Sequence, residues 1–561
     1  MGKFTKFFCI ICAFALIITA TALPSSAQAI SQENNKLDKP VIYKSNTGLD
    51  VIVTDEAQNG TIFPVTSSLE SSYTSPYISD VRDQKNSGTC WAFSALASLE
   101  STLLKDGISK QFSPMHMSYF ADPRSGSSGF QNEYFHGGGN HVPALAYLTT
   151  YSGAVLESDM PFNNTSTPDT EAYKKATPLY GADKVVYIDA QPNNKESIEN
   201  VKNAIKEYGS VTAAFGVYWK YFDINRKEYY CPDFNVLTAS GHGIQIVGWD
   251  DNHSKSNFVA STKPQNDGAW LCKNSWGTET GYNGLFYISY EDKSLFTKDY
   301  GNTYSIDTYH TINDSEKLYS HDGASIEDFT TGSSNTADYI SVFDFKDNFT
   351  TIEKINFEST AQGQSYKIYY IPINPSPNEP YKSKAKWTLI ASGTLEYSGH
   401  HSIDVNFNSK DYFTTKNGRG CIGIELAGNH GVGFSYDIDY SDGSPFYKSS
   451  AKKGECYVLS RSVLTDLCNW YSNVDAASFD IKALTKETFL CGDSNFNSEI
   501  TIEDATFIQQ ILAKIANNPT DNQTLCADAN QDEKVNILDV THLQRYLAKL
   551  SCSENIGTLL K

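Results

Sequence analysis

The sequence is short of positive charge. Its 561 residues include 45 Lys and Arg against 65 Asp and Glu, which gives a formal net charge of -20. A surplus of acidic groups repels the phosphates of nucleic acids and of anionic membranes, so both are disfavoured as partners. The acidic balance suits a soluble protein that works outside the cell.

Long apolar runs are missing beyond the N-terminus. The only such run, residues 7–20, follows Lys3 and Lys6 and precedes the small residues Ala27 and Ala29. This order is typical of a secretory signal peptide, which we predict over residues 1–29. No later segment approaches the length that a membrane-spanning helix needs, so we predict an exported protein without a membrane span.

Cysteines are present, but the sequence does not show which of them form disulfides. Two of the eleven cysteines, Cys9 and Cys12, lie in the predicted signal peptide. Export permits disulfides without requiring them, and the spacing of the others does not decide a connectivity. The length predicts three or four domains.

The segment 84–94 carries a glutamine six positions before a cysteine that opens a helical pattern. Behind Cys90, apolar residues recur at helical spacing from Ala92 to Leu103, so the sulfur lies at a predicted helix N-terminus. There the helix dipole favours the thiolate, which is the nucleophilic form. The side-chain amide of Gln84 and the backbone N–H of Cys90 could stabilise an oxyanion. A lone cysteine beside apolar residues is more often inert core.

Two later segments supply partners for this cysteine. His242 lies between two glycines at the start of a β-prone run, which leaves room beside the imidazole. Asn274 follows an apolar strand and begins the run Asn-Ser-Trp-Gly, so its amide could orient the imidazole.

Together, residues 60–300 resemble the papain-like cysteine peptidases in motif order and in the Gln-to-Cys interval. The resemblance implies an α+β fold and gives each residue a role: Cys90 as nucleophile, His242 as general base and acid, Asn274 as orienting residue, Gln84 as oxyanion-hole donor. Trp276 would shield the bond between Asn274 and His242.

Four further features bear on this resemblance. Ser87 stands where family members often carry a disulfide cysteine, and residues 254–267 enlarge the approach to the Asn motif, as in bacterial secreted members. Residues 30–60 are polar and lack the long helical pattern of a papain-type inhibitory propeptide. Gly138 and Gly139 resemble the family's glycine wall, which pairs with extended substrate; an ordinary flexible loop is the alternative.

The C-terminal segment contains a duplicated loop, with the second copy thirty-five residues after the first. In both copies oxygen-bearing side chains occupy positions 1, 3, 5, 9 and 12 of a twelve-residue loop, and position 7 offers its backbone carbonyl, a pattern that binds Ca²⁺. A helix with matched apolar positions follows each loop. The predicted ligands are Asp493, Asn495, Asn497, Glu499, Thr501 and Asp504 in the first loop, and Asp528, Asn530, Asp532, Lys534, Asn536 and Asp539 in the second.

Paired loops of this kind resemble a type I dockerin, which we place over residues 489–555. The resemblance implies two Ca²⁺ ions and a protein partner, a cohesin module on a scaffoldin. Recognition in the family uses exposed helix positions, here Glu503, Gln509, Gln510, Lys514, Leu538, Gln544, Arg545 and Lys549. Ser498 and Glu533 occupy the turn position that prefers glycine, where a left-handed backbone costs about 1 kcal/mol.

Between residues 301 and 485 the pattern changes to short alternating strands separated by turn residues, which predicts an all-β sandwich-like domain. It resembles the lectin-like domain that follows the peptidase in some secreted bacterial papain-like proteins. Its tyrosines could stack on a glycan, but a structural role is favoured over carbohydrate binding.

The predicted whole is a secreted or cell-surface cysteine endopeptidase acting on protein or peptide, tethered by a calcium-dependent dockerin and needing no cofactor for catalysis. Two alternatives stay open. One is a scaffold-attached, glycan-binding adhesion protein with a vestigial peptidase domain. The other is an amidase or transpeptidase that acts on cell-wall peptides through the same acyl-thiol intermediate.

Overall fold

The computed structural model describes most of the chain after residue 40. The described residues are 41–44, 50–53, 60–64, 69–120, 138–163, 175–223, 225–258, 263–321, 328–332, 337–345, 350–359, 362–407, 418–427, 433–438, 451–460, 462–469, 474–497, 499–516 and 518–560. The predicted signal peptide and Ser498 lie outside them. Within these residues no helix is long and apolar enough to cross a membrane.

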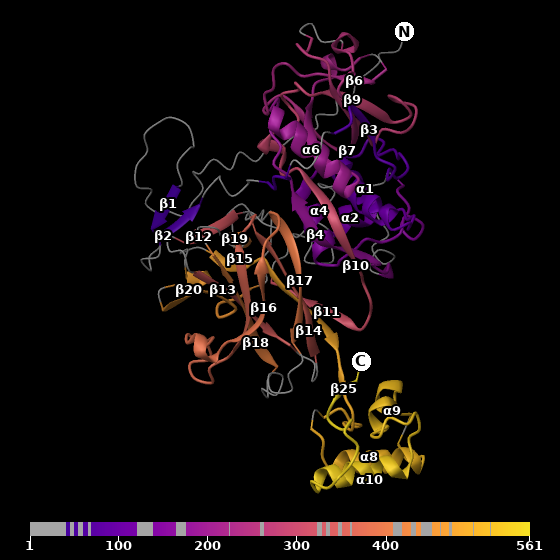
Figure 1. Ribbon diagram of the computed structural model, residues 1–561, viewed down its shortest axis with the longest axis vertical. Helices are drawn as coiled ribbons and strands as arrows, with labels where there is room; N and C mark the ends of the chain where they lie inside the picture. Colours follow the sequence, from indigo (N-terminus) through magenta and orange to yellow (C-terminus); the bar gives the residue numbers. More distant parts are fainter. Residues whose placement is uncertain are drawn as a thin grey trace, which may run out of the picture.

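Three units follow one another from top to bottom in Figure 1: a helix-and-sheet unit (residues 69–311), a β-rich unit (316–487) and a small C-terminal unit (489–560). The nine cysteines of these units are all free thiols, so none of the described cysteines forms a disulfide. An α+β unit, a β-sandwich and a small helical unit confirm the predicted fold class.

The helix-and-sheet unit places its helices against a mostly antiparallel sheet, in which only the pair β6 and β9 among the described strands is parallel. Its elements are β3 (Ser72–Thr74), α1 (Cys90–Lys105), α2 (Pro114–Phe120), α4 (His141–Thr149), β4 (Tyr180–Tyr187), α6 (Lys195–Tyr208), β5 (Val211–Val217), η3 (Trp219–Tyr221), β6 (Glu228–Tyr229), β7 (Ser240–Asp250), β8 (Ala269–Lys273), β9 (Leu285–Ser289) and β10 (Tyr304–Thr311). One core lies between α1, α4 and strands β4 and β10, and a second lies between α6 and strands β5, β7, β8 and β9.

The strands of the β-rich unit belong to three sheets, two of which face each other as a sandwich. Its strands are β11 (Glu316–Tyr319), β12 (Asp328–Gly332), β13 (Ala337–Asp344), β14 (Thr350–Ser359), β15 (Ser365–Pro372), β16 (Thr388–Thr394), β17 (Gly399–Phe407), β18 (Arg419–Leu426), β19 (Gly433–Ile438), β20 (Cys456–Ser460), β21 (Val463–Asp466), β22 (Val474–Phe479) and β23 (Ile481–Glu487). Strands β11, β23, β14 and β17 face the six-stranded sheet β16-β15-β18-β13-β20-β21 across a shared apolar core. On β15, Ile368 and Tyr370 are buried and Lys367 is exposed, as the predicted alternation requires.

The two larger units share one sheet. Strand β17 pairs with β4 through Gly399 opposite Val186 and His400 opposite Val185, so the sheet order runs β11-β23-β14-β17-β4-β10-β5-β7-β8-β9-β6. Strand β10 lies beyond the boundary predicted at residue 300, yet it pairs with β4 and β5. The backbone ladder therefore crosses from one unit to the other without interruption.

The polar N-terminal segment adds to the β-rich unit. Strands β1 (Val41–Lys44) and β2 (Asp50–Val53) form a hairpin, and β2 pairs with β12 in the five-stranded sheet β1-β2-β12-β19-β22. The segment that lacks the helical pattern of a propeptide thus contributes strands.

The C-terminal unit has the predicted two-fold repeat. It contains β24 (Phe489–Leu490), α8 (Ile502–Leu512), α9 (Asp521–Ala527), α10 (Ile537–Leu547) and β25 (Leu559–Leu560). Helices α8 and α10 pack together through matched residues, among them Ala505 and Ile508 against Val540 and Leu543. Strands β24 and β25 pair and close the unit.

Candidate functional site

The predicted nucleophile lies at the first residue of a helix. Helix α1 begins at Cys90, and its apolar positions Ala92, Leu96, Leu99 and Leu103 are fully buried in the core. Burial of that stripe fixes the rotation of the helix, so Cys90 occupies the end where the backbone dipole is positive.

Strand β7 is packed directly against this helix end. A Cβ atom added to Gly243 would lie 2.9 Å from Ser94 Oγ, 3.3 Å from the Trp91 Cα and 3.4 Å from the carbonyl carbon of Cys90. Only a residue without a side chain allows this approach. The glycine after His242 therefore brings the imidazole strand against the start of α1.

The hydrogen bonds of Asn274 fix the tautomer of His242. Asn274 Oδ1 lies 2.8 Å from the backbone nitrogen of Ser275, which can only donate, so this atom is the amide oxygen. The same oxygen lies 2.9 Å from His242 Nε2, which must therefore carry a proton. In the neutral ring Nδ1 is left as the proton acceptor.

Aromatic rings enclose the imidazole. The Trp276 ring stacks on His242 with centroids 4.6 Å apart, and Phe215 meets it edge-on at 5.8 Å. Burial lowers the pKa of His242 to about 4, and the hydrogen bond to Asn274 offsets part of this effect. Trp276 thus lies where the sequence predicted a shield for this bond.

The thiol is subject to opposing influences. Burial raises the pKa of Cys90, while backbone hydrogen bonds from Gly243, Trp91 and Cys90 itself lower it in part. Burial of each group separately therefore favours the neutral thiol and the neutral imidazole. A charged pair requires that both charges form together and stabilise one another.

Gln84 is held by several hydrogen bonds beside the loop that precedes α1. Its backbone nitrogen donates to the Ser275 carbonyl (2.9 Å), its Oε1 accepts from Ser275 Oγ (2.6 Å), and its Nε2 donates to the Ser87 carbonyl (2.8 Å). Because a carbonyl only accepts, the last bond assigns the amide nitrogen to the side of the Cys90 loop. The structure thus links Gln84 to the Asn274 segment through Ser275.

The described part of the glycine run lies over α1. A Cβ atom on Gly139 would fall 2.6 Å from the Trp91 ring, and Gly138 has a φ of +89°, which favours glycine. Asn140 then caps α4 through a 2.9 Å bond from the Val142 backbone nitrogen. The loop at Gly138 and Gly139 is therefore packed close to the residue that follows Cys90.

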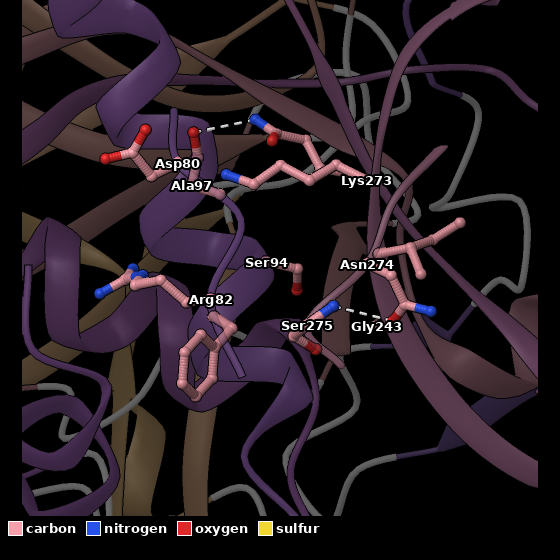
Figure 2. A pocket seen from close by; sticks show the side chains of 11 residues that line it. Asp80, Arg82, Ser94, Ala97, Gly243, Lys273, Asn274 and Ser275 are labelled. Carbon is pink, nitrogen blue, oxygen red and sulfur yellow. Dashed lines mark hydrogen bonds between the residues drawn. The ribbon is translucent and has the colours of Figure 1, made fainter. Parts of the chain in front are cut away.

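A small, partly open pocket lies beside the site, lined by residues of α1, β7 and β8 (Figure 2). Lys273, the neighbour of Asn274, points its ammonium group into this region on the side of Asp80 and Ala97. The ammonium donates to Ser79 Oγ (2.6 Å), and burial lowers its pKa to about 8. The residues behind Asn274 are thus polar and tightly held.

Two residues near the site carry no motif in the sequence. Trp219 is 59% exposed and lies with its ring centroid 5.4 Å from that of Trp276. The Arg226 guanidinium lies over both rings, at 4.7 Å from Trp219 and 5.3 Å from Trp276. Trp219 and Arg226 are far from Trp276 in the sequence, so only the folded structure shows that these three side chains lie together.

The duplicated loops fold around their predicted ligands. Asp493 Oδ1 accepts from the Asn497 backbone nitrogen and Asp528 Oδ1 from the Asp532 backbone nitrogen, each at 3.1 Å. The last carboxylates, Asp504 and Asp539, are fully buried. Backbone or side-chain hydrogen bonds within the same two loops involve the remaining predicted ligands: Asn495, Asn497, Glu499 and Thr501 in the first, Asn530, Asp532, Lys534 and Asn536 in the second.

These loops fit calcium chemically. Burial raises the pKa of Asp504 and of Asp539, and among the described residues neither forms an ion pair with a Lys or Arg. Clustered oxygen donors that lack a protein counter-charge match a hard cation such as Ca²⁺. Glu533 has a φ of +65°, the left-handed conformation that was predicted there.

Three family models match the chain in the order of the three units. The papain family cysteine protease model matches residues 66–308, the lectin like domain model residues 318–485, and the dockerin type I domain model residues 491–548. A solved structure of a variant of the clostridial cysteine protease Cwp84, after propeptide cleavage, has a TM-score of 0.64 and 30% identity and covers 74% of this chain and 100% of its own. The chain belongs to the papain family of cysteine proteases.

Other relatives agree with this assignment. The cysteine protease and lectin-like domains of Cwp84, a surface layer associated protein of Clostridium difficile, align with a TM-score of 0.65 at 29% identity over 76% of this chain and 90% of theirs. Cathepsin L of Sarcophaga peregrina and cathepsin L2 of Homo sapiens are each 26% identical over 38% and 39% of the chain. The matches span 56% and 59% of these two relatives' length.

The family models identify the three units. The helix-and-sheet unit is the papain-like peptidase domain, the β-rich unit is the lectin-like domain, and the C-terminal unit is a type I dockerin. The predicted resemblance to a papain-like peptidase with a lectin-like domain and a dockerin is confirmed.

Proposed function

We propose that the protein is a secreted cysteine endopeptidase that hydrolyses peptide bonds in polypeptide substrates. The observation that carries this proposal is the orientation of one imidazole. Asn274 Oδ1 holds His242 Nε2 as a donor and so reserves Nδ1 for a proton. Strand β7, which bears this imidazole, is packed against the helix end that begins with Cys90. Family membership and the cathepsin relatives support the same reaction.

The reaction begins with a proton transfer from the Cys90 thiol to His242 Nδ1. Each charge alone is opposed by burial, but the transfer creates both charges side by side, so each offsets the cost of the other. The dipole of α1 and the backbone donors around the sulfur favour the thiolate. The thiolate then attacks the scissile carbonyl carbon and forms an acyl-enzyme.

His242 completes the cycle as acid and then as base. The imidazolium donates its Nδ1 proton to the departing amine, and the neutral ring then takes a proton from the water that releases the acyl group. Asn274 acts through His242 as a positioning residue. Gln84 Nε2 and the Cys90 backbone N–H are the proposed donors to the oxyanion.

Substrate recognition is assigned to both sides of this centre. We assign Gly138 and Gly139 to backbone pairing with extended substrate, since this loop packs on Trp91 next to Cys90. We assign Trp276, with Trp219 and Arg226, to the leaving-group side, because the departing amine receives its proton from the imidazole that Trp276 covers.

The dockerin is proposed to bind two Ca²⁺ ions and a cohesin module of a scaffoldin. The two oxygen-lined loops would hold the ions. The predicted recognition positions are exposed on α8 and α10 or directly after them, and apolar residues recur beside them at equivalent places, Ile502 with Ile537 and Ile515 with Leu550. Such a tether and the surface-layer relative support an extracellular, scaffold- or surface-associated location.

The two rival functions make different predictions for Cys90. We would label the reduced, fully processed protein with an epoxysuccinyl thiol inhibitor and measure hydrolysis of casein, with Cys90→Ala as control. One label per chain and casein cleavage that the control lacks are expected. No labelling would favour the adhesion protein, and labelling with cleavage of peptidoglycan peptides but not casein would favour the amidase or transpeptidase.

A further inference from the structure

The junction between the peptidase and lectin-like domains contains a buried polar cluster. Strand register builds it: Glu358 on β14 pairs with His400 on β17, and Phe357 pairs with Ile481, which places Asp480 opposite Glu358. One imidazole and two carboxylates, from three adjacent segments, therefore share one site. His400 also pairs with Val185 of the peptidase strand β4.

The cluster is sealed from solvent. Glu358 is 2% exposed, His400 1% and Asp480 0%, and one ligand atom from each lies within 4.8 Å of the others. Among the described residues, neither ring nitrogen of His400 nor Asp480 Oδ2 has a hydrogen-bond partner. Orphaned polar atoms at such depth are costly, so the site requires something that the side chains themselves do not supply.

The charges around the cluster indicate the sign of the missing group. The Lys482 ammonium pairs with Asp480 Oδ1, and the Tyr187 hydroxyl of the peptidase domain donates to Glu358 Oε1. The cluster itself thus brings together two acidic side chains and one Lys, a balance that favours an added cation over an added anion. A neutral imidazole offers the lone pair of one ring nitrogen to a metal ion.

We propose that Glu358, His400 and Asp480 bind one divalent zinc-class metal ion at this junction. One imidazole and two carboxylates form a mixed nitrogen and oxygen donor set that suits Zn²⁺, whereas Ca²⁺ takes six or more oxygen ligands. Lys482 and Tyr187 hold the far oxygens of the two carboxylates, in the way that outer residues orient metal ligands. Because Tyr187 comes from β4, the peptidase domain helps to hold one of the three ligands.

The test uses the full chain in a Cys90→Ala background, which removes the thiol of the active site as a competing ligand. The protein is stripped with EDTA, returned to excess Ca²⁺ so that the dockerin is loaded, and titrated with Co²⁺ as a spectroscopic probe. About one equivalent of Co²⁺ with visible d–d absorption is expected, displaced by Zn²⁺. His400→Ala should lose this equivalent.

A matched control separates metal binding from damage to the fold. His253→Ala removes another buried imidazole that bonds to a carboxylate, Glu228 at 2.7 Å, in a place where the described residues supply no third ligand. It should keep the Co²⁺ equivalent. Equal Co²⁺ binding by His400→Ala and its parent, or no stoichiometric binding by the parent, would overturn the proposal; a buried water in the cluster predicts the second result.

A second variant covers the case in which His400→Ala does not fold. Asp480→Asn keeps the shape of the side chain and removes one charge. Zn²⁺ at about 100 times its dissociation constant should raise the melting temperature of the parent by about 5 °C and leave that of Asp480→Asn unchanged. The same rise in both proteins would refute the site.

Discussion

At the scale of single residues, Ser275 connects two parts of the site that are far apart in sequence. Its backbone nitrogen fixes the amide of Asn274, and its hydroxyl fixes the amide of Gln84. One residue thus orients both the group that holds the imidazole and the proposed oxyanion donor. The donor's contribution should be measurable without disturbing the thiol.

Gln84→Ala should lower kcat by about 10² with little change in KM, since the lost hydrogen bond strengthens only as the tetrahedral intermediate forms. Hydrolysis of a small peptide substrate measures this effect. Alkylation of Cys90 by iodoacetamide passes through no oxyanion and serves as the control. A parallel loss of alkylation rate would show that Gln84 acts on the thiol itself.

A buried imidazole in the lectin-like domain makes stability depend on pH. Burial lowers the pKa of His401 from 6.5 to about 3. Between these values the unfolded chain holds a proton that the folded chain does not, so stability falls as the pH falls, by about 1.4 kcal/mol per unit. Above pH 6.5 this contribution is constant.

His401→Gln removes the group whose protonation differs between the folded and the unfolded chain. Its calorimetric melting temperature should lie below that of the parent at pH 7, and the gap should shrink by the equivalent of about 2 kcal/mol at pH 5. A gap that stays constant between these pH values would mean that the His401 imidazole becomes positively charged in the folded domain as readily as in the unfolded chain.

The catalytic candidates were predictable because each belongs to a local motif. Gln84 and Cys90 share one short segment, while His242 and Asn274 are marked by their glycines and by the Ser-Trp-Gly that follows. Trp219 and Arg226 carry no such mark, since their relation to Trp276 exists only after folding.

At the scale of elements, the site depends on how closely β7 approaches α1. The sequence predicted a helix behind Cys90, a strand through His242 and a strand before Asn274, and the structure has α1, β7 and β8 there. It could not predict the pairing of β17 with β4, because contacts between segments more than 200 residues apart leave no periodic pattern in either strand.

Gly243→Ala should separate α1 from β7 by a few tenths of an ångström, because the new methyl group meets backbone atoms of Cys90 and Trp91. We expect kcat/KM to fall at least about tenfold, since small misplacements of reacting groups are expensive. Gly241→Ala is the matched control, as its methyl group meets the Tyr300 side chain instead. Equal activity of both variants would contradict this account of the packing.

At the scale of the whole molecule, the two junctions differ in kind. The peptidase and lectin-like domains share a continuous hydrogen-bonded sheet, whereas the dockerin follows β23 after a single residue and closes on itself through β24 and β25. The dockerin should therefore behave as an independent module.

Asp493→Ala combined with Asp528→Ala, or chelation of calcium, should abolish capture by a cohesin column, because each loop loses an acidic ligand that bonds to its own backbone. Hydrolysis of a small peptide should change by less than about twofold, since the active site lies in another unit. Simultaneous loss of capture and hydrolysis in the double variant would show that the dockerin supports the peptidase.

The shared sheet bears on how such a chain can be recombined. A genetic crossover at residue 488 breaks no strand pairing, so the dockerin can be exchanged between enzymes. A crossover between Thr311 and Glu316 would deprive β4 of β17 and leave it as a bare edge that invites aggregation. Recombination can therefore replace the dockerin freely, whereas the peptidase domain and the lectin-like domain must be inherited together.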